Sequence, residues 1–211
     1  MFRTTIRLSS LALCLLAACS DSSGPDGNRR VSVLLTDAPG DILEAVVTIE
    51  QIYLQGGDDE GEGEEGAGRV VLMDEPVTVD LLTLADDFMT LVENAEIPDG
   101  QFGQLRFVVS GGFIRVEQEE GEQIFASSAD YPELPEGAEV AGLLTMPSFS
   151  TSGLKVTFQG GLLLEEETTL LVDFDVAESF GQEVGSGKWV LHPVLKGSVV
   201  EEEEVTARRS R

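Results

Sequence analysis

Cysteine, histidine and tryptophan are nearly absent from this chain of 211 residues. It has two cysteines, one histidine and one tryptophan, and only 6% of its residues are aromatic. A single histidine excludes a multi-histidine zinc site. The Gly-x-Ser-x-Gly motif of serine hydrolases is also missing. These absences favour a protein without catalytic activity.

Basic residues are scarce as well. Thirteen Lys and Arg stand against 39 Asp and Glu, which gives a net charge of −26. A chain this acidic repels nucleic acid, which is therefore excluded as a partner, and it repels anionic lipid headgroups. Hydrophobic residues, at 42%, are numerous enough for a core. The composition suits an exposed, soluble surface protein or one that meets divalent cations.

The first 18 residues have the pattern of a secretory signal peptide. Arg3 and Arg7 precede a mostly apolar run at 8–16, which is too short to span a bilayer as a mature helix. The run ends in Leu16-Ala17-Ala18-Cys19, which resembles the lipobox of bacterial lipoproteins. In that class the chain is cut before the cysteine, whose thiol receives a diacylglyceryl group.

The resemblance to a lipobox implies that Cys19 is lipidated and that the protein is exported and anchored to a membrane of the cell envelope. Ser20 follows, which in the enterobacterial sorting scheme favours the outer membrane. Cys14 would leave with the signal peptide. The mature domain would then contain no thiol, which excludes cysteine-dependent catalysis and disulfides.

Composition divides the rest of the chain into three parts. Residues 19–30 are rich in Ser, Gly and Asp and are typical of a flexible tether. Residues 31–200 form one predicted domain, with a low-complexity acidic loop at 56–68. Residues 201–211 are a charged C-terminal tail.

The domain has mostly β-type periodicity, with apolar residues alternating along short runs. These runs are 31–36, 43–54, 69–73, 77–82, 101–109, 112–117, 122–126, 154–158, 168–176 and 188–200. We expect a hairpin at Ser110–Gly112 and at most one short helix, at Leu84–Asn94. Many short strands at this spacing predict an all-β fold, an antiparallel β-sandwich.

Three aspartates are the candidate functional carboxylates. Asp173 and Asp175 share one face of a predicted strand, about 7 Å apart. They suit a Ca²⁺ site or a general acid and base, or else they cap the turn at Ala177–Ser179. Asp37 precedes Pro39-Gly40, which fits a type II turn, and its side chain suits an Asx-turn. Turn chemistry alone accounts for Asp37, but it also completes a three-carboxylate calcium hypothesis.

Two further stretches resemble known motifs only in part. Asp58, Glu60 and Glu62 begin like an EF-hand loop, but Arg69 stands where a bidentate carboxylate is required. "VGSGKW" at 184–189 lacks two residues of the phosphate-binding loop and is better explained as a hairpin turn.

Six motifs in order carry a resemblance to a bacterial lipoprotein family, domain of unknown function 4382. They follow the lipobox: "TDAP" (36–39), "VDLLTL" (79–84), "LVENAEIPDGQFGQLRFVV" (91–109), "MPSFSTSGLKV" (146–156), "VDFDVAESF" (172–180) and "WVLHPVLKG" (189–197). The resemblance implies an immunoglobulin-like or transthyretin-like sandwich over about 30–200, with no assigned activity. The acidic insertion at 56–68 departs from the family pattern. Arg106 and Lys155 match it, and we expect them to form ion pairs with Asp173 or Asp175.

These observations predict a surface-anchored, non-catalytic lipoprotein that acts as a binding, adhesion or assembly module. Its expected partners are the membrane, through the N-terminal lipid, and an envelope protein or glycan. No cofactor is expected apart from a candidate Ca²⁺. The alternatives are a calcium-dependent ligand-binding domain, with glycans as one ligand, and a hydrolase that uses Asp37, Asp173 and Asp175.

Overall fold

The computed structural model describes residues 29–38, 42–56, 68–85, 87–119, 121–146, 153–182, 188–201, 203 and 205. The predicted signal peptide, Cys19, and nearly all of the tether, acidic loop and tail lie outside the described residues. So do Pro39 and Gly40, the proposed turn after Asp37.

Most of the described chain is β-strand. The elements are β1 (Arg29–Ala38), β2 (Glu44–Gly56), β3 (Arg69–Met73), β4 (Val77–Asp80), the 3₁₀ helix η1 (Leu81–Leu84), β5 (Met89–Ile97), β6 (Phe102–Gln118), β7 (Gly121–Ala126), β8 (Val140–Thr145), β9 (Leu154–Lys155), β10 (Thr157–Phe158), β11 (Glu167–Asp175), α2 (Val176–Ser179), β12 (Phe180–Gln182), β13 (Trp189–Leu191) and β14 (Leu195–Val200).

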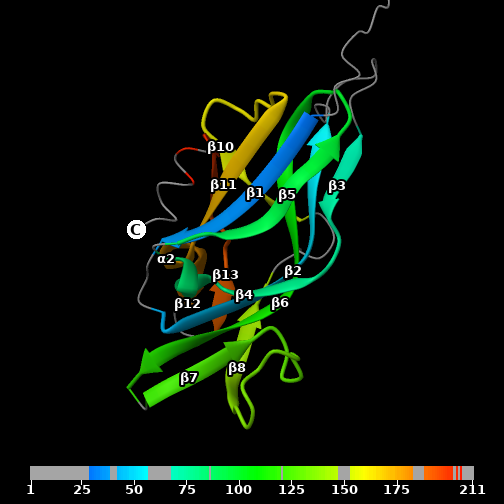
Figure 1. Ribbon diagram of the computed structural model, residues 1–211. Helices are drawn as coiled ribbons and strands as arrows, with labels where there is room; N and C mark the ends of the chain where they lie inside the picture. The colour runs from blue at the N-terminus through cyan, green and yellow to red at the C-terminus, as the bar shows by residue number, and fades with distance from the viewer. Residues whose placement is uncertain are drawn as a thin grey trace, which may run out of the picture.

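The strands form two sheets that pack face to face (Figure 1). Sheet A has the order β10-β14-β11-β1-β5. Sheet B has the order β12-β13-β8-β7-β6-β2-β3, with β4 also paired to β2 and β9 to β6. The predicted all-β sandwich is therefore confirmed.

Alternating side chains of the central strands fill the space between the sheets. Val31, Val33 and Leu35 of β1 are fully buried, and the same face of β11 contributes Leu170 and Val172. Sheet B supplies a matching set from β2 and β6. Its fully buried members include Val47, Ile52, Leu54, Leu105 and Ile114. This period of two is the pattern by which the sequence predicted the strands.

Several pairings in both sheets are parallel, which the antiparallel expectation did not include. β1 pairs with β11 in parallel, and the same holds for β10 with β14, β7 with β8, and β8 with β13. Central parallel strands are usually covered on both faces. Leu34 and Leu171, on the outer face of sheet A, are indeed buried.

The predicted hairpin at Ser110–Gly112 is wrong, because β6 runs unbroken through these residues. A register shift against β2 leaves Ser110 as an extra residue in a bulge. A Cβ atom on Gly112 would lie 2.5 Å from the Val46 carbonyl oxygen, and one on Gly111 would lie 2.8 Å from the Tyr131 ring. The glycines serve close packing here rather than a turn.

The predicted helix at Leu84–Asn94 is also wrong. Its first residue ends η1, and the rest leads into β5, which pairs with the edge of β1. Asn94 has a positive φ of 49° in a bulge of β5, and its backbone N–H donates to the Ser32 hydroxyl. Pairing with β1 outweighs the helical spacing of the apolar residues.

The strands that flank the 184–189 stretch, β12 and β13, pair antiparallel, with Gln182 opposite Trp189. The predicted turn itself, at 184–187, lies outside the described residues.

We predict that Gly112→Ala destabilises the fold by about 1–3 kcal/mol, because the new methyl group would be forced against the Val46 carbonyl. Gly103→Ala is the matched control in the same strand, since its Cβ would meet nothing within 4 Å. Urea unfolding of both variants measures the difference. Equal stabilities would contradict the assignment of Gly112 to the interior of a continuous strand.

Candidate functional site

Two of the three predicted aspartates hold the first turn of α2. Asp175 is the N-cap residue, and its Oδ1 accepts a hydrogen bond from the Glu178 N–H at 3.0 Å. Asp37 Oδ1 accepts from the Val176 N–H at 3.1 Å. The first N–H groups of a helix have no partner within the helix. The two carboxylates therefore supply acceptors that the four-residue helix needs.

The parallel register of β1 and β11 brings Asp37 to this turn. Asp37 lies opposite Phe174, and Ala38 lies opposite Asp175. Asp37 and Asp175 are both buried. The sequence predicted a local Asx-turn for Asp37, whereas the structure shows a bond to a residue 139 positions away.

Lys196 of β14 forms ion pairs at the acidic end of β11. Its ammonium lies 2.8 Å from Asp175 Oδ2 and 3.1 Å from Glu178 Oε2. Burial raises the pKa of Asp175, but the bonds from Lys196 and the Glu178 N–H outweigh it and hold the pKa below its usual range. The same two carboxylates raise the pKa of Lys196.

Asp173 has a different environment on the same face. Its Oδ1 is buried and has no hydrogen-bond partner among the described residues. Burial and the neighbouring Asp175 carboxylate raise the pKa of Asp173, and Lys196 offsets this only in part. The ionised form of Asp173 is thus disfavoured in the folded state, whereas that of Asp175 is favoured.

The three aspartates do not form a common site. Thr36 is the register partner of Asp173, so the next residue, Asp37, faces the opposite side of sheet A. Within the described ranges, no group of three or more His, Cys, Asp or Glu side chains is arranged to hold a metal ion. The expected calcium site at Asp37, Asp173 and Asp175 is therefore corrected, and the alternative in which the acids cap the turn is confirmed for Asp175.

The expected ion pairs of Arg106 and Lys155 with these aspartates are also corrected. Arg106 and Lys155 are register partners on β6 and β9, in sheet B, whereas Asp173 and Asp175 lie in sheet A. Lys196 takes the expected role instead. Sequence reasoning missed Lys196, although it stands in the "WVLHPVLKG" motif, because strand pairing across 21 residues cannot be read from one segment.

Arg106 and Lys155 instead belong to a polar surface on the outside of sheet B, which we call the basic face. Its members are Gln51, Tyr53, Gln55, Arg69, Val71, Gln104, Arg106 and Lys155. Their strand neighbours Leu54, Leu105 and Leu154 point into the core. The members therefore share the outer face, because side chains alternate along a strand.

Neutral groups position two arginines of the basic face. The Arg69 guanidinium lies 3.7 Å from the centre of the Tyr53 ring and donates to Gln51 Oε1. Arg106 donates through Nε and Nη2 to Gln104 Oε1, at 2.9 and 2.7 Å. Lys155 is exposed beside Arg106.

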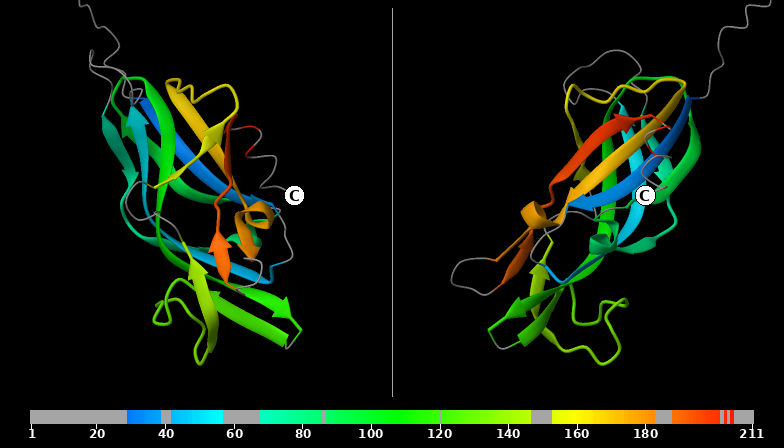
Figure 2. Two further views of the ribbon diagram at one scale, coloured as in Figure 1. Left: turned by 180° about the vertical axis from the view of Figure 1, so that it is seen from behind. Right: turned by 60° about the vertical axis from the view of Figure 1, so that its left-hand side comes forward.

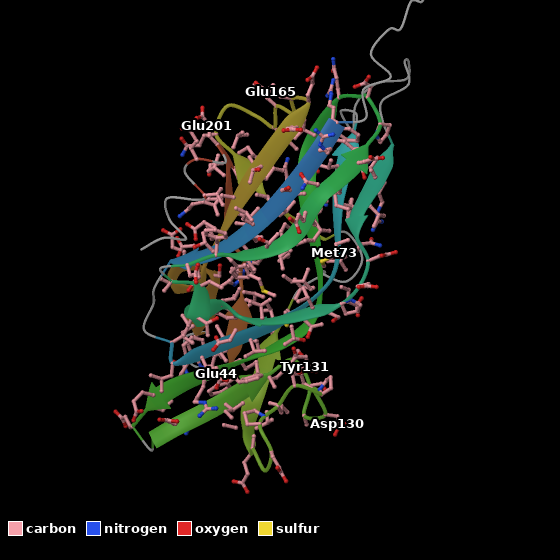
Figure 3. The ribbon with its side chains drawn as sticks, viewed as in Figure 1. Glu44, Met73, Asp130, Tyr131, Glu165 and Glu201 are labelled. Carbon is pink, nitrogen blue, oxygen red and sulfur yellow. The ribbon has the colours of Figure 1, made fainter. Side chains whose placement is uncertain are left out.

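A third polar cluster lies on the outer face of sheet B, where β2 pairs with β4. The Tyr131 hydroxyl is 2.6 Å from the Thr48 hydroxyl, which is 3.0 Å from that of Thr78. Burial raises the pKa of Tyr131. The ring packs on Phe113 and covers Gly111, so it fastens the β7–β8 connection to the sheet. Figure 3 shows Asp130 and Tyr131 on this connection.

The fold and these regions define an all-β sandwich domain with an aspartate-capped turn and a basic sheet face. Comparison with known proteins gives the family: the model of a domain of unknown function (DUF4382) matches residues 28–193. The chain belongs to this family. No curated protein and no solved structure matches it. No helix among the described residues is long and apolar enough to cross a membrane.

We predict that Asp37→Ala destabilises the domain by about 1–3 kcal/mol, since it leaves the buried Val176 N–H without its acceptor. Asp37→Asn keeps an oxygen acceptor and should cost less. Asp99→Ala is the control, because it removes only an exposed ion pair with Arg29. Chemical unfolding measures all three; an Ala variant as stable as the control would contradict the capping role.

We predict that Asp173→Asn stabilises the protein at pH 7. A carboxyl group whose pKa is raised in the folded state opposes folding when it is ionised. The gain should shrink as the pH falls through this raised pKa. It should vanish below the ordinary value of 3.8, where the carboxyl is protonated in both states.

Asp175→Asn is the matched comparison, with the opposite sign. The lowered pKa of Asp175 means that its ionised form stabilises the fold above the ordinary pKa, and this contribution is lost as the pH falls through the lowered value. Thermal melts from pH 3 to pH 7 measure both variants. Equal shifts in the same direction would contradict the assigned roles.

Proposed function

We propose that this protein is a lipid-anchored binding module of the bacterial cell envelope, exported and held through Cys19, without catalytic activity. The observation that carries the proposal is the position of β1 relative to Cys19 in the sequence. Arg29, ten residues after Cys19, starts β1 at one end of the sandwich, and β7 and β8 lie at the other end (Figure 2). A lipid on Cys19 would hold one end and present the rest.

The connecting segment limits how far the domain can stand from the lipid. Ten residues span at most about 35 Å when fully extended. The end of the sandwich with Arg29 would therefore remain near the membrane surface, while the long axis of the domain points outward.

The surface at this end suits a position near lipid without insertion. Glu165 lies at this end in Figure 3, and Glu167 forms an ion pair with Arg30. These acids repel anionic headgroups. The covalent lipid, rather than the protein surface, would then supply most of the membrane affinity.

Binding is favoured over catalysis because the candidate carboxylates are engaged in structure. Asp37 and Asp175 accept backbone N–H groups, and Lys196 neutralises Asp175. A general acid and base need to reach a substrate, and these two buried groups serve the α2 turn instead. The calcium-dependent and hydrolase alternatives thereby lose the three-carboxylate cluster on which they depended.

We predict that Cys19→Ala moves the protein from the membrane fraction to the soluble fraction and removes the mass of a diacylglyceryl modification. Cys14→Ala is the matched control, since this cysteine lies in the predicted signal peptide and its loss should leave anchoring unchanged. Fractionation with intact-mass spectrometry measures both. A Cys19→Ala protein that still partitions with membranes would overturn the lipoprotein proposal.

A further inference from the structure

A cleft of about 410 Å³ opens at the end of the sandwich where β1 begins. Arg29 lines it together with two segments that are far apart in the sequence: residues 100–103, which lead from β5 into β6, and residues 162–164, which precede β11. The volume lies in the range of about 300–1,000 Å³ that is usual for ligand sites. The cleft shares no residue with the α2 turn or with the basic face.

Residues 162–164 are three consecutive leucines with unequal burial. Leu162 is buried and belongs to the core, whereas Leu163 is 73% exposed, more than any other large hydrophobic residue that the structure describes. A run of apolar residues at the surface of a soluble domain is unfavourable unless it serves a contact. Leu163 therefore offers an apolar contact at the cleft.

The cleft also offers backbone groups at a free strand edge. On the side of β6 away from β2, the described pairing ends at Leu105, whose carbonyl accepts from the Val156 N–H. Phe102–Gln104 have no strand partner on that side within the described ranges. Residues 162–164 make no backbone–backbone hydrogen bond with any described residue. A free edge of this kind is where an extended peptide adds through main-chain hydrogen bonds.

Acidic side chains adjoin the cleft. Glu165 and Glu166, directly after the leucines, are exposed and form no ion pair with any described residue. Arg29 does not offset them, because it pairs with Asp99 and donates to the Gly100 carbonyl. The net charge of −26 adds to the same field. The cleft therefore favours a ligand with a positive charge beside its apolar group and disfavours an anionic one.

We propose that the cleft binds an extended segment of another envelope protein, in which an apolar side chain stands next to a lysine or arginine. The backbone of the segment adds to the free edge of β6, its apolar side chain contacts Leu163, and its basic side chain lies near Glu165 and Glu166. This inference rests on the proposed function, because an exported and anchored protein meets such partners. Arg29 lies ten residues after Cys19, so the segment would be bound within about 35 Å of the lipid.

Two other occupants match the cleft less well. Residues 20–28 of the chain itself contain two aspartates, no basic residue, and no Leu, Ile, Val, Met or aromatic residue. They supply neither the charge nor the apolar side chain. An acyl chain would contact Leu163 but would leave the edge of β6 without hydrogen-bond partners. A polypeptide with apolar and basic residues supplies all three kinds of contact.

The test measures binding of the acetylated and amidated peptide Lys-Val-Thr-Val-Lys to the full mature chain, in detergent and low salt, by calorimetry. Leu163→Ser should weaken binding about tenfold, because the apolar contact is lost. Leu143→Ser is the matched control, since Leu143 of β8 is also an exposed leucine, at 51%, and lies outside the cleft. It should bind within about twofold of the wild type, and both variants should keep the wild-type melting temperature.

A second pair of variants tests the charge. Glu165→Gln/Glu166→Gln should weaken binding about threefold in low salt, and added salt should then reduce the affinity less than it does for the wild type. Glu133→Gln/Glu136→Gln is the matched control, with the same change in net charge on exposed residues of the β7–β8 connection. It should keep the wild-type affinity to within about twofold.

The proposal is overturned if the peptide does not bind in low salt, or if either test variant loses no more affinity than its matched control. It is also overturned if Glu-Val-Thr-Val-Glu binds as tightly, or if Lys-Pro-Thr-Pro-Lys does, since proline has no backbone N–H to donate. Binding of phosphatidylcholine vesicles that depends on Leu163, without binding of the peptide, would assign the cleft to lipid instead.

Failure of this inference is distinguishable from failure of the proposed function. Cys19→Ala removes the anchor but leaves the cleft intact, so it should retain the affinity for the peptide. A protein that is lipidated but does not bind the peptide retains the anchoring proposal and loses only this partner.

Discussion

The parallel pairing of β1 with β11 is the contact on which the rest of the domain depends. It joins nine register pairs from Arg30–Glu167 to Ala38–Asp175 and places the first strand inside sheet A, between β11 and β5. β5 then adds to the free edge of β1, and β14 adds to β11. Without this pairing, β5 would not belong to the same sheet as β14 and β10. The inner face of sheet B would then be exposed to solvent.

The same register explains why a carboxylate stands at position 37. The chain turns into α2 directly after β11, and the backbone N–H of Val176 there is buried. Asp37, on the adjacent parallel strand, supplies the acceptor that this group needs. Asp37 is thus a consequence of the topology, and its buried position follows from the inward alternation of Val31, Val33 and Leu35.

Local patterns were sufficient to predict most strands, because alternation depends only on which face is buried. β1, β2, β3, β7 and β11 all begin and end within two residues of their predicted bounds. The predictions from the sequence were wrong where contacts with residues distant in the sequence determine the structure. Gly111-Gly112 has the composition of a turn, but Tyr131 and Val46 require small residues there.

The candidate site was predictable in part for the same reason. A capping role for Asp175 was expected, since its acceptor and donor are three residues apart. The partner of Asp37 and the cation beside Asp175 come from segments 139 and 21 residues away. Hydrogen bonds of that separation depend on sheet order, which a single sequence with no repeat does not determine.

The charged side chains of the domain have different kinds of partner in the two sheets, which the amino-acid composition alone does not show. Around α2, Lys196 pairs with Asp175 and Glu178, and these contacts stabilise the turn. On the outer face of sheet B, Tyr53 and Gln51 position Arg69, and Gln104 positions Arg106.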